Sequence, residues 1–485
     1  CIFSFTCINF DYSIINFVLI SKSLPENKMN FEQCIELLYK FSQKALAEHL
    51  KSLPDNERDE LISEISSVNF DKIDDLLRIA NSESKIGRKM MPADCISLKS
   101  LSENQEYLNK CTDYGVNLIK RGAVAAFVVA GGQGSRLGFD GPKGAFPVSA
   151  VRNKTLFQLH AEKVLSASRK YNTNIPFLIM TSQANHAATL EEFEKNSYFG
   201  LDHKNVHIFP QNMIPSLDVE GKLILSGKTS LFRNPDGHGG SLSALESSGV
   251  LDRIMSQGIE LISYFQVDNP LINIIDPLFC GIHGIEKSEL SSKALTKAYP
   301  DEKVGIFVKY DDSTVGVEEY SDLPKDILSA EDSNGSLLYK WGSIGIHLFS
   351  CNFIKHNISG GEINLPFHVA RKKIKAYVKG EIKEIDGFKF EKFVFDSIPL
   401  AKKTIILETL RENEFAPVKN ASGVDSLESS RDLMNNLFRS WLLEKNYSIP
   451  DFVRNIEISP LTALCSNDLP SDLSIDWEEN TYIGI

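Results

Sequence analysis

Five short apolar runs, separated by helical stretches, constrain the fold of this chain more than any other feature. The runs lie at residues 125–130, 175–182, 206–211, 259–269 and 304–310. Their length and their content of β-branched and aromatic residues are typical of buried strands. Between several of them lie stretches with helical periodicity, such as residues 155–171. Because strands alternate with helices, we expect an α/β domain with a mostly parallel sheet, whose ligands bind at the carboxyl ends of the strands.

The chain divides into segments of different pattern. In residues 29–112, apolar residues recur with helical spacing after a capping-box pair, Asn30 and Gln33, which predicts a helical N-terminal domain. The alternating runs place the α/β domain at residues 113–385. Residues 386–485 mix strand and helix patterns and are expected to form a small C-terminal α/β domain.

The first 28 residues differ from the rest of the chain. They are apolar enough to suggest a membrane span, but they carry Asp11 within the run and lack a starting Met and a basic leading region. Residues 1–28 are therefore expected to be a non-native or disordered extension, with an N-terminal membrane anchor as the alternative.

The overall charge and the cysteines exclude several classes of function. The chain of 485 residues has a formal net charge of −12. This acidic balance argues against a nucleic-acid partner, because phosphate backbones attract dense Lys and Arg surfaces. The net charge does not exclude a phosphorylated small molecule as ligand, because such a ligand needs only a few basic residues in one cleft. The spacing of the eight cysteines indicates neither a zinc site nor a disulfide framework, so we expect a cytoplasmic protein that does not bind membranes.

A glycine-rich loop follows the first apolar run, and residues 128–148 read VVAGGQGSRLGFDGPKGAFPV. Its spacing fits neither of two common phosphate motifs: Lys143 is followed by Gly144 instead of Ser or Thr, and Leu137 stands where a dinucleotide fingerprint needs its third glycine. Successive glycines still allow backbone N–H groups to approach an anion closely. Arg136 and Lys143 add positive charge suited to phosphate. We therefore expect this loop to bind phosphate groups.

Asp268 is the carboxylate that most strongly indicates a metal. It ends the apolar run ISYFQVD, where a charge is costly unless it has a partner. A Mg²⁺ ion that bridges phosphate oxygens would be a natural partner. The alternative is that Asp268 caps a helix in the following loop.

The glycine loop and seven downstream motifs resemble, in the same order, the family of UDP-N-acetylhexosamine pyrophosphorylases. The downstream motifs are KTLFQLHAEKV, FPQNMIPSLDVEGKLIL, NPDGHGGSLSAL, FQVDNPL, VEEYSDL, FEKFVFDSIPLAKK and EFAPVKNASG. The resemblance covers the chain from Met29 to its end. It implies a nucleotidyltransferase fold, Rossmann-like and GT-A-like, with a mixed, mostly parallel sheet. It also implies a monomer or weak homodimer.

The activity implied by the resemblance is uridylyl transfer. UTP and N-acetylglucosamine-1-phosphate, or another N-acetylhexosamine-1-phosphate, would react to a UDP-sugar and pyrophosphate, with Mg²⁺ or Mn²⁺ as cofactor. The sugar-phosphate oxygen would attack the α-phosphate of UTP in line, and the protein would align the two polyanions and neutralise their charge.

The resemblance also implies a role for each matching residue. The catalytic residues would be Arg136, Lys143 and Lys419, the last contributed by the C-terminal domain. The nucleotide would be bound by Val129, Ala130, Gly131, Gly132, Gln211, Gly237, His238 and Lys389. The sugar would be bound by Gly305, Glu319, Tyr320, Ser343, Phe393 and Phe395. The metal ligands would be Asp268 and Asp396.

Two residues depart from the family pattern, and both concern the sugar. His238 and Ser343 stand where the family usually has asparagine, and a related group of UDP-glucose pyrophosphorylases has histidine in a similar GHG loop. A UDP-glucose or broad UDP-sugar pyrophosphorylase is therefore one alternative. A catalytically inactive nucleotide-binding scaffold is another, although retention of Asp268 and the three catalytic cations argues against it.

Overall fold

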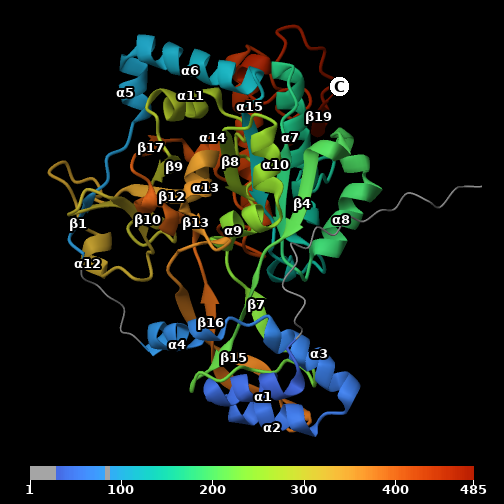
Figure 1. Cartoon of the computed structure of the whole chain (residues 1–485). Coiled ribbons are helices and arrows are strands. Elements are labelled where there is room, and N and C mark those ends of the chain that lie inside the picture. The colour runs from blue at the N-terminus through green and yellow to red at the C-terminus, as the bar shows by residue number, and fades with distance from the viewer. Residues whose placement is uncertain (1–28, 82–87, 485) are drawn as a thin grey trace, which may run out of the picture.

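The computed structural model describes residues 29–81 and 88–484, and the prediction for residues 1–28 lies outside the described residues. Figure 1 shows a large domain built around a sheet and, below it, a smaller lobe. Among the described residues, no helix combines the length and the apolar character needed to cross a membrane.

The large domain is built on a ten-stranded mixed sheet. Its main order is β1 (Met90–Pro92), β10 (Gly305–Tyr310), β12 (Trp341–Ser350), β8 (Leu261–Gln266), β2 (Val124–Val129), β3 (Phe177–Thr181) and β4 (Val206–Pro210). The strands β11 (Val315–Glu318), β9 (Leu290–Thr296) and β17 (Thr404–Glu408) pair beside this path. The pairs among β8, β2, β3 and β4 are parallel, whereas β12 is antiparallel to β8 and β10. The predicted α/β class is confirmed, and each of the five apolar runs contains a strand.

Helices cover both faces of this sheet (Figure 1). One face is covered by α6 (Gln105–Lys120), α7 (Leu156–Tyr171), α11 (Pro277–Ile285) and α15 (Leu427–Glu444), and the other by α9 (Gly240–Ser247), α10 (Val250–Ser256) and α13 (Cys351–Asn357). Shorter or peripheral helices are α5 (Leu98–Glu103), α8 (His186–Lys195), α12 (Lys325–Leu328) and α14 (Arg411–Glu414).

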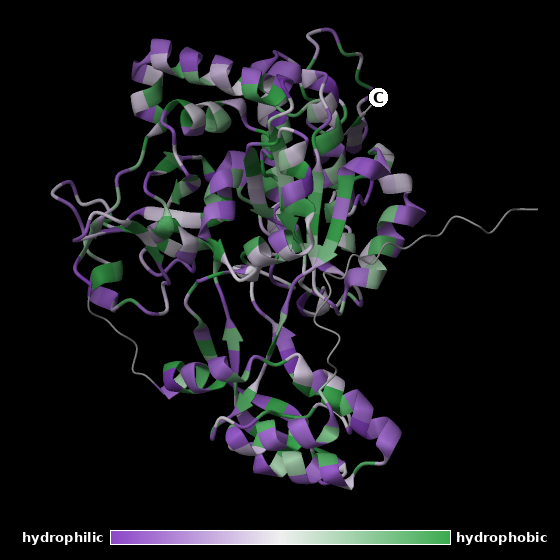
Figure 2. Ribbon diagram, in the orientation of Figure 1, coloured by the Kyte–Doolittle hydropathy of each residue, from purple (hydrophilic) through white to green (hydrophobic). Residues whose placement is uncertain are grey.

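The central strand β2 explains why the apolar runs are continuous instead of alternating. Every residue of β2 is buried. Ala126 and Val128 belong to the core beneath α6 and α7, whereas Phe127 and Val129 belong to the core beneath α9 and α10. Because successive side chains of a strand point to opposite faces, a strand covered on both faces must be apolar throughout. Figure 2 shows these hydrophobic strands at the centre of the large domain.

The lower lobe combines helices with a twisted hairpin. It contains α1 (Phe31–Lys40), α2 (Lys44–Ser52), α3 (Asp55–Ser66) and α4 (Ile73–Asn81), together with β15 (His368–Val378), β16 (Glu381–Glu391) and β6 (Leu217–Asp218). The predicted capping box of Asn30 and Gln33 begins α1. Side chains of both kinds of element share one core, in which Leu38 and Leu61 cluster with Phe390.

The segments expected as an N-terminal and a C-terminal domain are each divided between the lobe and the large domain. Of residues 29–112, α1 to α4 lie in the lower lobe, whereas α6 packs against α11 of the large domain. Of residues 386–485, the end of β16 lies in the lobe, and β17 extends the central sheet by pairing with β9. Two-stranded pairs complete the fold: β5 (Met213–Pro215) with β7 (Arg233–Pro235), β13 (Ile358–Ser359) with β14 (Glu362–Ile363), and β18 (Asn455–Ile458) with β19 (Asn480–Ile483).

Candidate active site

The glycine-rich loop leaves the carboxyl end of β2 and is held by groups from the loops after β3 and β4. Asn185 Nδ2 donates to the carbonyl oxygens of Ala130 at 2.9 Å and Gly132 at 3.2 Å. A Cβ on Gly131 would lie 2.5 Å from Gln211 Oε1, so a larger residue at position 131 would force the Gln211 side chain to move. Asn185 was not predicted, because nothing in its local sequence distinguishes it from a surface asparagine.

The side chain of Gln211 is oriented by a hydrogen bond to an acidic residue, Asp236. Its Nε2 donates to Asp236 Oδ1 at 3.3 Å, and burial raises the pKa of Asp236 to about 7 despite the nearby Lys392. The neighbouring Gly237 has φ +83° and lies so close to the Lys392 carbonyl that a Cβ would be 2.4 Å from its oxygen. Both the left-handed conformation and the contact therefore require glycine here.

Asp268 follows β8 and forms an ion pair with Lys143, and it lines the same cleft as Lys419. Lys143 Nζ donates to Asp268 Oδ2 at 2.9 Å, and both side chains are 16% exposed. Burial alone would raise the pKa of Asp268, but the ammonium groups of Lys143 and Lys419 together lower it below its usual value. The backbone N–H of Val418 donates to the Asp268 carbonyl at 2.9 Å, which brings Lys419 to this place. The carboxylate is therefore ionised and faces two cations.

A cleft of about 250 Å³ opens beside Asp268. Seven of the predicted residues line it: His238, Asp268, Gly305, Glu319, Ser343, Phe395 and Lys419. Lining residues that were not predicted include Gln266, Asn269, Lys303, Gly345, His347 and Phe415. Gly305 and Ser343 are neighbours because β10 and β12 pair antiparallel at this point. The structure thus brings together residues from motifs far apart in the sequence.

An aromatic wall closes one side of the cleft. The ring of His238 stacks on Phe393 with centroids 5.1 Å apart and 8° between the planes. His238 Nδ1 accepts a hydrogen bond from Val394 N at 3.1 Å, and burial lowers the pKa of His238 to about 4. The imidazole is therefore neutral near pH 7, with its proton on Nε2. This neutral donor occupies the position at which the resembling family usually has an amide.

Several predicted residues, Phe393 among them, do not line the cleft itself. Lys389 lies on β16 in the lower lobe, with its Nζ 5.3 Å from the centroid of the Phe232 ring. Asp396 accepts a hydrogen bond from His368 Nε2 at 2.8 Å. Arg136 belongs to the glycine loop but is exposed, and Tyr320 is not among the cleft-lining residues. Lys389 is thus not among the cleft-lining residues, and its contact with the nucleotide stays a prediction.

The residues around Asp268 suit a metal ion that takes few ligands from the protein. Within residues 29–81 and 88–484, no group of three or more His, Cys, Asp or Glu side chains is arranged as a metal site. Mg²⁺ commonly takes one or two carboxylates and completes its shell with phosphate oxygens and water. The single ionised carboxylate of Asp268 suits that mode. Asp396 is less suited to a second ligand, because its carboxylate is engaged by His368.

The His368–Asp396 pair predicts a pH dependence of stability. Burial lowers the pKa of His368, but the hydrogen bond and the charge of Asp396 outweigh this and raise it above the ordinary value of 6.5. Such a group stabilises the folded state fully below pH 6.5, and this contribution is lost as the pH rises through the folded-state pKa. Urea unfolding across this range should show the loss, and Asp396→Asn should remove it. An unchanged profile in the variant would contradict this role of the pair.

The α/β sheet, the glycine loop and the lysine-flanked carboxylate at its rim define a nucleotidyltransferase. The chain belongs to the UTP--glucose-1-phosphate uridylyltransferase family, whose model matches residues 74–467. It is 33% identical to UDP-N-acetylglucosamine diphosphorylase 2 of Arabidopsis thaliana over 474 residues, which cover 93% of each chain. It is 31% identical to the UDP-N-acetylglucosamine pyrophosphorylase of Saccharomyces cerevisiae, with 90% of this chain and 95% of the relative covered.

A solved structure resembles the whole fold. The uridine diphosphate N-acetylglucosamine pyrophosphorylase of Trypanosoma brucei, crystallised with an inhibitor, aligns with a TM-score of 0.80 and 27% identity. The alignment covers 92% of this chain and 95% of that one. The likeness therefore extends through the lower lobe as well as the central sheet.

Proposed function

We propose that this chain transfers the uridylyl group of UTP to N-acetylglucosamine-1-phosphate and releases pyrophosphate. The observation that carries the proposal is the ionised Asp268, flanked by Lys143 and Lys419 at the end of the glycine loop. The relatives named as UDP-N-acetylglucosamine pyrophosphorylases support the choice of sugar.

The nucleotide would lie along the rim formed by β2 and β4. Backbone groups of residues 129–132 and the amide of Gln211 would hold the uracil, since this amide is buried and oriented by Asp236. Arg136 is exposed at the loop and would meet the departing pyrophosphate. Held in this way, the α-phosphate would face the cleft beside Asp268.

The sugar phosphate would occupy the cleft and attack without a protein nucleophile. One of its phosphate oxygens forms the new bond to the α-phosphorus while the bond to the β-phosphate oxygen breaks and its electron pair leaves with pyrophosphate. Because that oxygen is already ionised, no general base is required. Lys143 and Lys419 would neutralise charge on the phosphate oxygens. A divalent cation, Mg²⁺ or Mn²⁺, held by Asp268 would add further charge neutralisation.

The sugar ring would lie against the aromatic wall and Glu319. Burial raises the pKa of Glu319, which marks a carboxyl group that gains from a hydroxyl or amide partner. Gly305 supplies space at this end of the cleft, and Ser343, shorter than the expected asparagine, supplies more. The neutral His238 can donate a hydrogen bond to an uncharged ligand group.

Replacing Gly132 with alanine tests whether the space above the loop holds the nucleotide. A Cβ on Gly132 would meet no protein atom within 4 Å, so the free energy of unfolding should change by less than about 1 kcal/mol. The KM for UTP should nevertheless rise about tenfold, because the methyl group enters the ligand's space. Gly227, which is equally open, provides the matched control. An unchanged KM for UTP in Gly132→Ala would contradict the placement.

A panel of sugar phosphates tests the proposed substrate. The purified chain would be supplied with UTP, Mg²⁺ and, in turn, the 1-phosphates of N-acetylglucosamine, N-acetylgalactosamine and glucose. We expect the highest kcat/KM with N-acetylglucosamine-1-phosphate, by about tenfold or more over glucose-1-phosphate. Equal or better use of glucose-1-phosphate would identify His238 and Ser343 as the residues that changed the specificity. No UDP-sugar from any member of the panel would contradict the proposed function.

The net charge and the cysteines support our expectations about the partners and the cellular location of the chain. The net charge of −12 gives no basis for binding nucleic acid. All six cysteines of the described residues are free, and four of them are buried, which agrees with a cytoplasmic location. A monomer or weak homodimer remains our prediction for the state in solution.

A further inference from the structure

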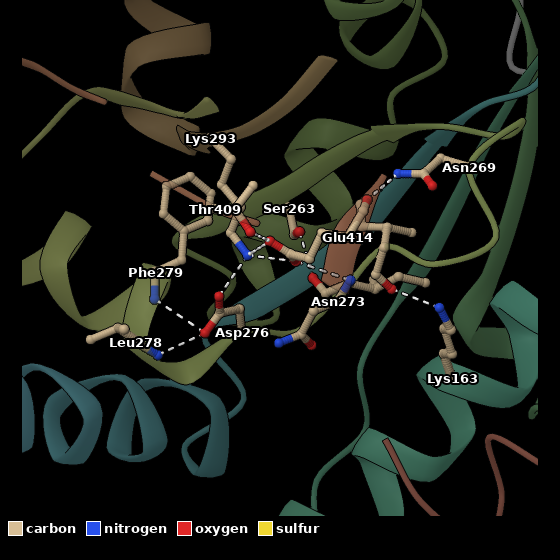
Figure 3. Close-up of polar contacts among 12 residues, drawn as sticks. Lys163, Ser263, Asn269, Asn273, Asp276, Leu278, Phe279, Lys293, Thr409 and Glu414 are labelled. Carbon is tan, nitrogen blue, oxygen red and sulfur yellow. Dashed lines mark hydrogen bonds and ion pairs between the residues drawn. The ribbon is translucent and has the colours of Figure 1, made fainter. Parts of the chain in front are cut away.

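A buried lysine, a buried carboxylate and a half-buried carboxylate lie together between β9 and the start of α11 (Figure 3). Lys293 Nζ lies 2.6 Å from Asp276 Oδ2 and 2.6 Å from both carboxylate oxygens of Glu414. Thr409 Oγ1 donates to Glu414 Oε2 at 2.6 Å, and Asn273 N donates to Oε1 at 3.2 Å. Lys293 is 2% and Glu414 5% exposed. The Glu414 carboxylate is thus held by three donors, although its side chain also lines a cavity of about 350 Å³.

The cluster joins two loops that each deliver a residue to the cleft. The first loop, residues 268–276, follows β8 and begins with Asp268. The second loop, residues 409–419, follows β17 and ends with Lys419. Lys163 of α7 holds the first loop from the other side, because its Nζ donates to two backbone carbonyls there at 2.5 and 2.7 Å (Figure 3). Each loop is therefore anchored by buried polar groups close to its functional end.

Backbone contacts continue from the cluster to the cleft. Asn269 Nδ2 donates to the Glu414 carbonyl at 2.6 Å, and Asn269 Oδ1 accepts from Ala416 N at 3.0 Å. Val418 N then donates to the Asp268 carbonyl at 2.9 Å. These hydrogen bonds join the two loops along their length, from the buried Glu414 to Asp268.

Buried charges of this kind impose a geometry, because each loses its partner if the others move. Replacing buried ion pairs by apolar residues often costs no stability, so we take the role of this cluster to be the position of the two loops. We infer that Glu414, together with Lys293, is a positioning residue that holds the second loop so that Lys419 reaches the same phosphates as Asp268. The inference rests on the proposed function, because the effect is read through uridylyl transfer.

A double-mutant cycle tests whether Glu414 acts through Lys419. Glu414→Gln keeps the side-chain shape but removes one of the two carboxylate charges that hold Lys293, and we expect kcat to fall about tenfold with little change in KM for the sugar phosphate. In the Lys419→Ala background, the same Glu414→Gln change should lower kcat less than about twofold, because the group it positions is already absent. Equal losses in the two backgrounds would overturn the inference.

A matched control separates positioning from general loss of stability. Lys154 and Glu162 form a second buried pair with Nζ–Oε2 at 2.6 Å and side chains 7% and 6% exposed. Glu162→Gln should lower the unfolding midpoint to a similar degree while leaving kcat of the folded enzyme unchanged. If Glu162→Gln lowers kcat as much as Glu414→Gln, the effect is structural and the inference fails.

A second variant and a second measurement keep the test decisive. Should Glu414→Gln not fold, Thr409→Val removes only the hydroxyl donor to Glu414 and should lower kcat in the same Lys419-dependent way. Hydrogen exchange of residues 415–419 should also become faster in either variant, and this readout does not require activity. A wild-type chain without uridylyl transfer would refute the proposed function. Unchanged exchange in an active variant would refute the positioning role.

Discussion

Replacing Asp268 with asparagine is expected to lower kcat by about a thousandfold, because catalysis of phosphoryl transfer depends on groups that neutralise charge in the transition state. The change keeps the size of the side chain but removes the carboxylate that contacts Lys143 and would hold the divalent cation. The backbone bond from Val418 N to residue 268 is unaffected, so the chain should stay folded. Steady-state assays with UTP and N-acetylglucosamine-1-phosphate, alongside thermal unfolding, measure both effects.

Asp113→Asn is the control for this variant. Asp113 is exposed on α6, away from the cleft, and its replacement should change neither activity nor unfolding. If Asp268→Asn retains wild-type kcat at saturating Mg²⁺, Asp268 does not hold the metal, and the site must be assigned elsewhere.

Replacing Lys419 with alanine is expected to lower kcat about a hundredfold, the effect typical of removing one group that stabilises developing negative charge. Lys419 lines the cleft and is 40% exposed, and its contact with Asp425 is as long as 3.9 Å. Such a loosely held lysine contributes little to folding, so the free energy of unfolding should change by less than about 1 kcal/mol. Kinetics and chemical denaturation of the same preparation give both quantities.

Lys110→Ala provides the matched control for Lys419→Ala. Lys110 is exposed on α6, and alanine favours the helix, so activity and stability should both be retained. A Lys419→Ala variant that loses stability but keeps its kcat would show that Lys419 is structural.

The central sheet could be predicted from the sequence because its parallel strands are buried on both faces. A strand such as β2 has no polar side to interrupt the apolar run, so its position is evident. The hairpin of β15 and β16 could not be predicted in the same way. In β15, the three consecutive residues 371–373 are charged and exposed, so they interrupt the apolar pattern that would mark a buried strand. The helical pattern of the lobe was therefore visible, but the strands that complete its core were not.

Site residues could be predicted where their motif directly follows a strand. They could be predicted less well where the pairing of distant strands brings them to the cleft. The glycine loop and Asp268 follow apolar runs directly, so their rim position could be predicted. His347 and Gly345 reach the cleft only because β12 runs antiparallel beside β8, which local sequence does not reveal. Lys389 lies on β16 in the lobe, whereas Lys392, three residues later, lies close to Asp236. A short step along an extended chain changes the face a side chain occupies.

Phosphorus NMR of the wild-type chain with UTP, N-acetylglucosamine-1-phosphate and Mg²⁺ tests the central claim most directly. Signals of UDP-N-acetylglucosamine and pyrophosphate should rise in equal amounts as UTP and the sugar phosphate decline, and added pyrophosphate should drive the reverse reaction. Loss of UTP to UDP and inorganic phosphate, or no change in any signal although UTP binds, would contradict uridylyl transfer at this cleft.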